Sequence, residues 1–235
     1  MLAIYKREMR SYFTTSAGYV FAALFLAISG LLFGLLTMEL YQTTDVSVYY
    51  QFLMFAYVIV IPMLTMKTFA EERRTKTEQL LLTAPVSLFS IVFAKFLAAF
   101  TMFLGTIAVT WIYMIPLCMY GDPNMGRVFG CMIAVILVGM CFIAVGIFVS
   151  SLTDNQFTAV LGTIGILAAM LGISMLNSVI DFYPLRVVLS FFSIYSRYSN
   201  FTYGIFDYAA AFYYVSVAAV FLLLAVRVYE RRRWN

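Results

Sequence analysis

The sequence AGYVFAALFLAISGLLFGLLTM, residues 17–38, runs for 22 residues without a charged side chain. The hydrocarbon core of a bilayer is about 30 Å thick, and a helix of roughly 20 apolar residues crosses it. Five further uncharged and largely apolar runs follow, at residues 48–66, 96–120, 128–150, 157–180 and 208–226. The sequence therefore predicts an all-α, polytopic membrane protein with six transmembrane helices.

The composition leaves little room for a soluble module. Hydrophobic residues make up 64% of the 235-residue chain and charged residues 11%, so we expect one membrane domain over residues 1–235. The absence of histidine excludes HExxH zinc sites and Ser-His-Asp triads. The cysteines Cys118, Cys131 and Cys141 lack CxxC spacing, and we expect them to pack as small apolar side chains. We predict no catalytic residue, no metal site and no cofactor on this chain.

Basic residues are distributed unequally between the two sides of the predicted bundle. If the loops alternate from an inner N-terminus, 12 of the 15 basic residues lie inside and 3 outside. The inner residues are Lys6, Arg7, Arg10, Lys67, Arg73, Arg74, Lys76, Lys95, Arg227, Arg231, Arg232 and Arg233; the outer residues are Arg127, Arg186 and Arg197. The positive-inside rule then places both termini in the cytoplasm. The first apolar run is too long for a signal peptide, so we expect it to remain as the first crossing.

Two segments outside the spans have amphipathic patterns. Residues 1–16 alternate basic and apolar side chains at helical spacing, which predicts an interfacial helix on the inner leaflet. Residues 180–207 contain nine aromatic residues among many polar ones. This segment is too polar to cross twice and too apolar for a solvated loop. It therefore predicts re-entrant or interfacial helices at the outer face.

Small residues in two spans indicate close helix packing. Residues 30–34 form a GxxxG pair, and the fifth span has similar small-xxx-small pairs. Such pairs let helix backbones approach closely, so we expect them at helix packing, dimer or gate contacts. The predicted residues are Gly30, Gly34, Gly162, Gly165, Ala169 and Gly172.

A tight inner turn separates the fourth and fifth spans. Its sequence, TDNQ at residues 153–156, predicts a capping box with Thr153 as the N-cap and Gln156 at the third helical position. A partner contact is the alternative reading. Under that reading, Asp154 and Asn155 form a second inner contact.

The inner loop at residues 67–90 combines charged and apolar segments. It contains EERRTKTEQLLLTAPVS at residues 71–87, where a charged entry is followed by Leu80, Leu81 and Leu82 and ends at Pro85. The pattern predicts a short amphipathic helix in the cytoplasm. A leucine run at this position favours burial against another surface over a solvated loop.

These residues resemble the coupling-helix region of bacterial ABC-2-type transporter permeases. GIFVSSLTDNQ at residues 146–156 and RVYERRRW at residues 227–234 are also similar to that family, including its gliding-motility and nitrous-oxide-reductase-maturation branches. The resemblance implies a permease of the bacterial inner membrane that pairs with a second copy or a paralogue. It further implies separate ABC ATPase subunits that hold ATP and Mg²⁺. We also expect contact with membrane lipid and with an extracytoplasmic accessory protein. We expect no contact with nucleic acid.

The resemblance assigns docking of the ATPase to the loop. Charged side chains there would set the register on the partner, and the leucines would supply a buried apolar contact. The predicted docking residues are Glu71, Glu72, Arg73, Arg74, Thr75, Thr77, Glu78, Gln79, Leu80, Leu81, Thr83 and Ala84.

No Asp, Glu, Lys or Arg lies within the six apolar runs, which argues against ion-coupled transport. Walker motifs are also absent, so energy would enter through a partner. The apolar spans favour export of an amphipathic or lipid-like substrate. Two alternatives remain open. One is an intramembrane enzyme, which would lack its usual acid–base residues. The other is an ATPase-coupled scaffold that remodels a complex without moving solute.

Overall fold

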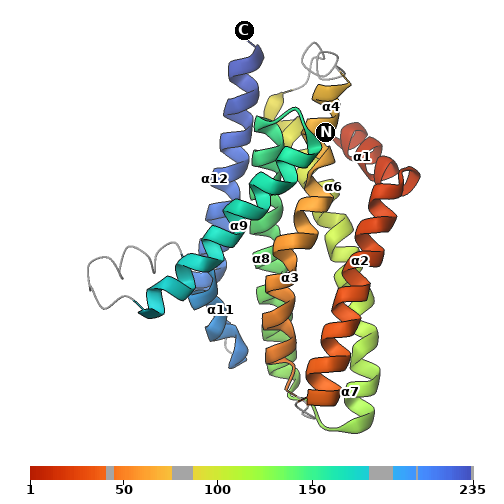
Figure 1. The fold of residues 1–235 in the computed structure, drawn as a ribbon, viewed down its shortest axis with the longest axis vertical. Coiled ribbons are helices and arrows are strands. Elements are labelled where there is room, and N and C mark those ends of the chain that lie inside the picture. The colour runs from red at the N-terminus through yellow and green to blue at the C-terminus, as the bar shows by residue number, and fades with distance from the viewer. Residues whose placement is uncertain (41–44, 76–86, 180–192, 205, 234–235) are drawn as a thin grey trace.

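The computed structural model describes residues 1–40, 45–75, 87–179, 193–204 and 206–233, and no strand occurs in these ranges. Figure 1 shows the chain as a bundle of helices. In chain order the elements are α1 (Leu2–Thr14), α2 (Ser16–Leu32), the π-helix η1 (Phe33–Leu40), α3 (Ser47–Thr65), α4 (Lys67–Arg74), α6 (Leu88–Thr110), the 3₁₀-helix η2 (Trp111–Tyr113), α7 (Met114–Tyr120), α8 (Met125–Leu152), α9 (Gln156–Val179), α11 (Ile194–Thr202) and α12 (Tyr208–Arg233).

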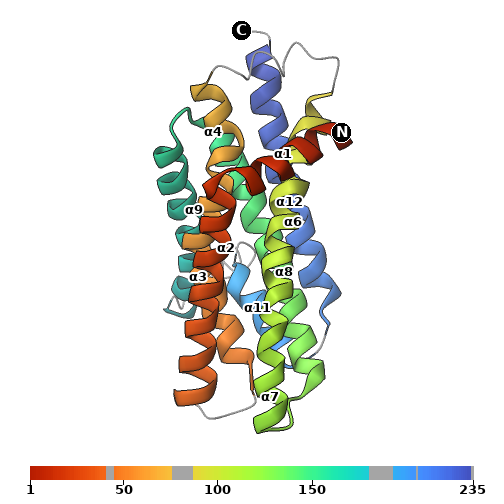
Figure 2. The ribbon, with the colours of Figure 1, turned by 90° about the vertical axis from the view of Figure 1, so that its right-hand side faces the viewer.

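Six helical stretches are long and apolar enough to cross a membrane, which confirms the predicted fold class and number of crossings. They are Ser16–Met38, Ser47–Arg74, Leu88–Met119, Met125–Leu152, Gln156–Ser174 and Tyr208–Arg232. Both chain termini and α4 lie at one end of the bundle, and α7 lies at the other (Figures 1 and 2). An even number of crossings requires this arrangement of the termini.

Helix α8 forms the core of the bundle. Within its most apolar window 67% of the residues are buried, against 22% in α9. Two glycines, seven residues apart on one face of α8, make this packing possible. A Cβ at Gly139 would collide with the ring of Phe103 in α6, and a Cβ at Gly146 would collide with Thr65 in α3. These glycines were not among the predicted packing residues, although their spacing places them on one helix face.

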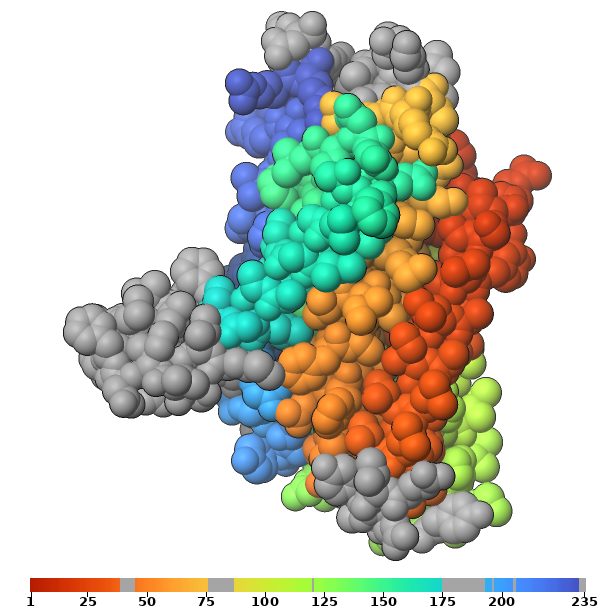
Figure 3. Space-filling model, in the orientation of Figure 1, coloured from red at the N-terminus to blue at the C-terminus, as the bar shows by residue number. Residues whose placement is uncertain are grey.

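The predicted small residues have few neighbours within the chain. A Cβ at Gly30 would lie 3.2 Å from the Tyr113 hydroxyl, and one at Gly162 would lie 3.1 Å from Val149 Cγ1. A Cβ at Gly34, Gly165 or Gly172 would have no neighbour within 4 Å among the described residues, and Ala169 is exposed. Figure 3 shows α9 running diagonally over the outside of the bundle. Contact of these positions with a second copy or a gate remains a prediction.

Aromatic side chains pack between the first three spans near the α7 end. The Phe33 ring in η1 stacks on Tyr113 in η2 with ring centroids 4.9 Å apart, and it meets Tyr49 edge-on at 5.6 Å. The hydroxyls of Ser29 and Tyr49 form a hydrogen bond of 2.7 Å. The π-helical end of the first span and the 3₁₀ turn of the third span therefore meet in one aromatic cluster.

The predicted outer segment at residues 180–207 contains one described helix, α11, while residues 180–192 and 205 lie outside the described ranges. Ile194, Tyr198 and Phe201 of α11 are almost fully buried. Helix α11 approaches α8 so closely that a Cβ at Gly130 would lie 2.9 Å from the carbonyl oxygen of Phe201. A short helix is thus present here. Its re-entry into a membrane remains a prediction.

Helix α1 lies across the end of the bundle, over α2 and α6 (Figure 2). The Tyr5 hydroxyl donates a 3.2 Å hydrogen bond to Thr101 in α6. Tyr12 is buried, and its hydroxyl donates to the carbonyl oxygen of Leu64, at 3.4 Å. The opposite face of α1 exposes Leu2 and Phe13 among other residues. One face of α1 thus packs on the bundle and the other is exposed, as expected for an interfacial helix. The position of α1 at a membrane surface remains a prediction.

Candidate functional site

Helix α4 extends the second span beyond the apolar core at the end of the bundle that carries both termini. It contains or adjoins five of the predicted docking residues, from Glu71 to Thr75. The others, Thr77, Glu78, Gln79, Leu80, Leu81, Thr83 and Ala84, lie outside the described residues, as does Leu82. The structure therefore describes the base of the predicted docking loop and how the bundle holds it.

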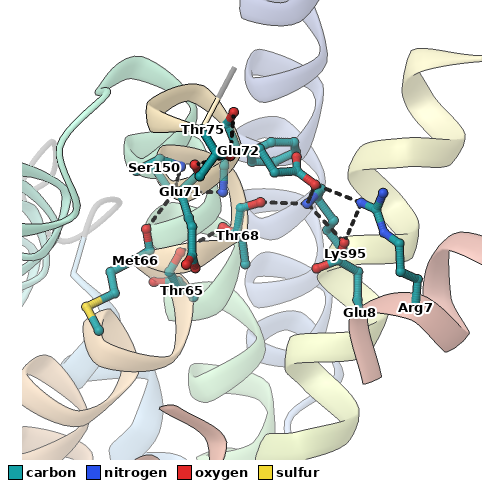
Figure 4. A network of polar contacts seen from close by, with 12 residues as sticks. Arg7, Glu8, Thr65, Met66, Thr68, Glu71, Glu72, Thr75, Lys95 and Ser150 are labelled. Carbon is teal, nitrogen blue, oxygen red and sulfur yellow. Dashed lines mark hydrogen bonds and ion pairs between the residues drawn. The ribbon is translucent and has the colours of Figure 1, made fainter. Parts of the chain in front are cut away.

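One side of α4 faces a compact cluster of four charges, shown in Figure 4. Lys95 Nζ in α6 lies 2.9 Å from Glu72 Oε1 and 3.2 Å from Glu8 Oε1. Arg7 Nη2 in α1 lies 2.7 Å from the same Glu72 oxygen and 2.9 Å from Glu8. Two positive and two negative side chains from three helices thus form a cluster with no net charge. We refer to Arg7, Glu8, Glu72 and Lys95 as the four-charge cluster.

Lys95 is the most buried member, with 1% of its side chain exposed. Its ammonium group also donates a 2.6 Å hydrogen bond to the carbonyl oxygen of Thr68 and lies 4.9 Å from the ring centroid of Phe69. A buried ammonium loses its hydration and needs several close partners to compensate. The two carboxylates, the carbonyl oxygen and the ring provide them. This arrangement explains how α6 tolerates a cation in the sequence SIVFAKFLAA, residues 90–99.

The other side of α4 is hydrogen-bonded to the end of α8. The backbone N–H groups of Phe69 and Ala70 each donate to Ser150 Oγ at 3.2 Å, and Ser150 Oγ donates to the carbonyl oxygen of Met66 at 3.3 Å. Helix starts leave N–H groups without partners inside the helix. A serine from a neighbouring helix supplies such a partner here.

An ion pair continues this contact into the turn between α8 and α9. The Arg73 guanidinium pairs with Asp154 and donates a 3.2 Å hydrogen bond to the carbonyl oxygen of Leu152. Arg73, predicted to dock the ATPase, and Asp154, predicted to form a second inner contact, are therefore direct neighbours. Asp154 keeps 67% of its side chain exposed, so the pair is open to solvent.

The predicted capping box in this turn is wrong. Helix α9 begins at Gln156, and the Asn155 side-chain oxygen accepts a 3.0 Å hydrogen bond from the backbone N–H of Phe157. Asn155 is therefore the cap, and Gln156 is the first helical residue. The Thr153 hydroxyl instead donates, at 3.5 Å, to the carbonyl oxygen of Val149 in the preceding helix. Asparagine caps as well as threonine does, so the sequence alone allowed either start.

Helix α4 also meets the last helix. The rings of Phe69 and Tyr229 in α12 pack with centroids 4.6 Å apart. Arg74 and Thr75, at the C-terminal end of α4, are exposed, whereas Glu72 keeps only 15% of its side chain exposed. Of the predicted docking charges, Arg74 thus faces outward and Glu72 faces the bundle.

The site consists of ion pairs and hydrogen bonds that join α4 to α1, α6 and α8. Within the described ranges, no group of three or more Cys, Asp or Glu side chains is placed to hold a metal ion. Sequence reasoning missed Arg7, Glu8, Lys95 and Ser150 as parts of this site. Lys95 could have been found as the one basic residue in an otherwise apolar helix over residues 88–110.

The chain matches a known protein family over almost its whole length. A family model described as "ABC-2 family transporter protein" matches residues 2–234. No curated protein matches the chain. The family match covers all six apolar helices and the α4 segment. The chain therefore belongs to the ABC-2 family of transporter proteins, whose members are the membrane-embedded permease subunits of ABC transporters.

Proposed function

We propose that this chain is the permease half of an ATP-driven exporter and that separate ATPase subunits dock on residues 71–84. Docking would occur at the end of the bundle that carries both termini, which we place in the cytoplasm of a bacterial cell. ATP and Mg²⁺ belong to the ATPase in this proposal. A second permease copy or a paralogue completes the pathway, and an amphipathic or lipid-like molecule is the substrate.

The observation that carries the proposal is the double attachment of α4. On one side α4 is bound through Glu72 to Lys95 in α6 and to Arg7 in α1. On the other side it is bound to Ser150 and Asp154, at the end of α8 and in the turn that follows. A segment that receives force from a partner must not rotate freely against the bundle. Helix α4 is fixed to two parts of the bundle at once.

The first experiment is purification of the tagged chain with its genomic neighbours in mild detergent. Mass spectrometry identifies stoichiometric partners, and nucleotide hydrolysis is then measured on the complex. We expect a co-eluting P-loop ATPase. Purification of the chain without any nucleotide-hydrolysing partner would contradict the proposal.

Charge reversal separates docking from folding. Arg74→Glu changes an exposed charge at the C-terminal end of α4, and we expect it to weaken binding of the ATPase by about tenfold, or ~1.4 kcal/mol. Arg127→Glu makes the same change at the opposite end of the bundle and serves as the control. Equal binding of the ATPase by the two variants would exclude Arg74 from the docking surface.

Lipid export needs its own assay. Proteoliposomes containing the complex and NBD-phosphatidylethanolamine would be tested for ATP-dependent appearance of the probe in the opposite leaflet. Movement of the probe would support a lipid-like substrate. ATP hydrolysis without such movement would contradict this substrate class while leaving the docking proposal in place.

A further inference from the structure

The four-charge cluster joins three elements that are far apart in the sequence. Arg7 and Glu8 come from α1, Glu72 from α4 and Lys95 from α6. Figure 4 shows the side chains pointing toward one another between these helices. The docking segment is therefore linked not only to membrane-spanning helices but also to α1, which lies across the end of the bundle.

Three members of the four-charge cluster are largely buried, whereas Arg7 keeps 52% of its side chain exposed. The exposed fractions of the Lys95, Glu8 and Glu72 side chains are 1%, 14% and 15%. Charges at such depth are little screened, and loss of one partner leaves the others unbalanced. A displacement of Glu72 must therefore be followed by Lys95 and Glu8, or the cluster must break.

Helix α1 is held to three neighbouring helices by hydrogen bonds and an ion pair. Its contacts with α6 and α3 include the Tyr5–Thr101 and Tyr12–Leu64 hydrogen bonds, at 3.2 and 3.4 Å. Its contact with α4 is an ion pair between long side chains, Arg7 and Glu72, at 2.7 Å. Its outer face carries the exposed residues Leu2, Lys6 and Arg10.

We propose that ATPase docking on α4 is transmitted through the four-charge cluster to α1, with Lys95 as the positioning residue that links the two helices. This inference rests on the proposed function, because it assumes that residues 71–84 bind the ATPase. It adds a second responding element, the N-terminal helix, to the docking unit. The docking state of the ATPase is thereby communicated to the part of the chain predicted to lie on the inner leaflet.

Hydrogen–deuterium exchange tests the link in the intact complex. The permease, in nanodiscs of phosphatidylethanolamine and phosphatidylglycerol, is compared with and without its co-purifying ATPase. We expect ATPase binding to slow exchange of the α1 amides by about threefold or more, because docking restricts local opening. Arg7→Gln combined with Glu8→Gln removes both charges through which α1 joins the cluster and keeps the Lys95–Glu72 pair. In this variant we expect the α1 response to disappear while the α4 response remains.

Two further variants guard against a purely structural effect. Lys95→Arg keeps a cation between Glu8 and Glu72 and a donor for the carbonyl oxygen of Thr68. We expect it to retain the α1 response that Lys95→Met loses. Glu230→Gln removes an exposed carboxylate of an ion pair on α12 and should leave the α1 response unchanged. An α1 response that survives in the Arg7→Gln, Glu8→Gln double variant, or is absent in the wild type, would overturn the inference.

Failure of the inference is distinguishable from failure of the proposed function. If no ATPase binds the wild-type permease, the proposed function fails. If the ATPase binds and protects α4 but α1 does not respond, docking stands and only the transmission to α1 fails.

Discussion

Helix α4 at one end of the bundle and helix α11 toward the other are both short and both packed against α8, but different contacts hold them. Helix α4 buries Phe69 and Ala70, and it is also held through charged and polar groups, including Glu72, Arg73 and the Ser150 hydroxyl. Helix α11 is held mainly by buried Ile194, Tyr198 and Phe201 and by the close approach of its backbone to Gly130.

The difference predicts which of the two helices can shift when a partner binds. Ion pairs between long side chains tolerate small shifts, because rotamers adjust while the charges stay close. Apolar side chains packed against a glycine have no such freedom, because close packing has few alternative arrangements. We therefore expect α4 to respond to a partner and α11 to serve as a fixed element. Four predictions test this contrast, in order of decreasing effect.

The largest effect is expected at Lys95. Lys95→Met leaves Glu8 and Glu72 with Arg7 as the remaining cation of the cluster, and loss of a partner from a buried ion cluster costs about 3–5 kcal/mol. The unfolding midpoint in an SDS titration from detergent micelles measures this loss. Lys95→Arg, which keeps the cation between the two carboxylates, should lose much less stability. An unchanged midpoint for Lys95→Met would show that the cluster does not hold α4.

The second effect concerns the packing of α11. Gly130→Val places side-chain atoms against the carbonyl oxygen of Phe201, and overpacking of this kind costs about 1–3 kcal/mol. We expect α11 to shift and the buried thiol of Cys131 to react with a maleimide, in a Cys118→Ser background. Gly105→Val is the matched control, because a Cβ at Gly105 would meet no atom of the described residues within 4 Å. Equal thiol reactivity in the two variants would contradict the rigid packing of α11.

A smaller effect is expected at Ser150. Ser150→Ala removes the acceptor for two backbone N–H groups of α4, which costs about 1–2 kcal/mol. Hydrogen exchange of Phe69 and Ala70 should become faster while that of α11 is unchanged. Ser216→Ala serves as the control, because the Ser216 hydroxyl donates to Tyr213 within its own helix. Faster exchange in both variants would point to general loosening of the bundle.

The smallest effect is expected at the outer ion pair between Asp45 and Arg127, 3.2 Å apart. Partial burial raises the pKa of Asp45, but hydrogen bonds from Ser47 and the charge of Arg127 outweigh this and leave it below its ordinary value. A carboxyl with a lowered pKa in the folded state stabilises the fold at higher pH, and this contribution is lost as the pH falls through that pKa. We expect the ion pair to contribute about 0–1 kcal/mol to the free energy of unfolding, because both side chains are more than 40% exposed. This contribution should be constant from about pH 8 to 5 and lost below about pH 4.

The comparison of Asp45→Asn with the wild type across this pH range measures the contribution. A difference that persists unchanged at about pH 3 would show that the pair does not act through its charge. High salt should reduce the difference, whereas it should affect the Lys95 variants little, because buried pairs are less screened.

The sequence by itself determined the all-α class, the six crossings and the family. Each crossing is encoded in a continuous run of about 20 apolar residues, and continuous runs are visible without knowing any distant contact. The sequence did not determine the residue at which each helix begins. At the turn between α8 and α9, Thr153 and Asn155 are both good caps, and the choice of Asn155 depends on how the chain enters α9.

Only the tertiary structure decided what the charged residues of α4 do. The sequence around Glu72 predicts a surface charge. The fold instead brings Glu72 beside Lys95, 23 positions later, and Arg7, 65 positions earlier. Likewise, Arg73 and Asp154 become neighbours only because α4 packs against the end of α8. Hydrophobicity and helical periodicity are local properties of the chain. The partner of a charge is set by which helices lie side by side, and no local pattern records that choice.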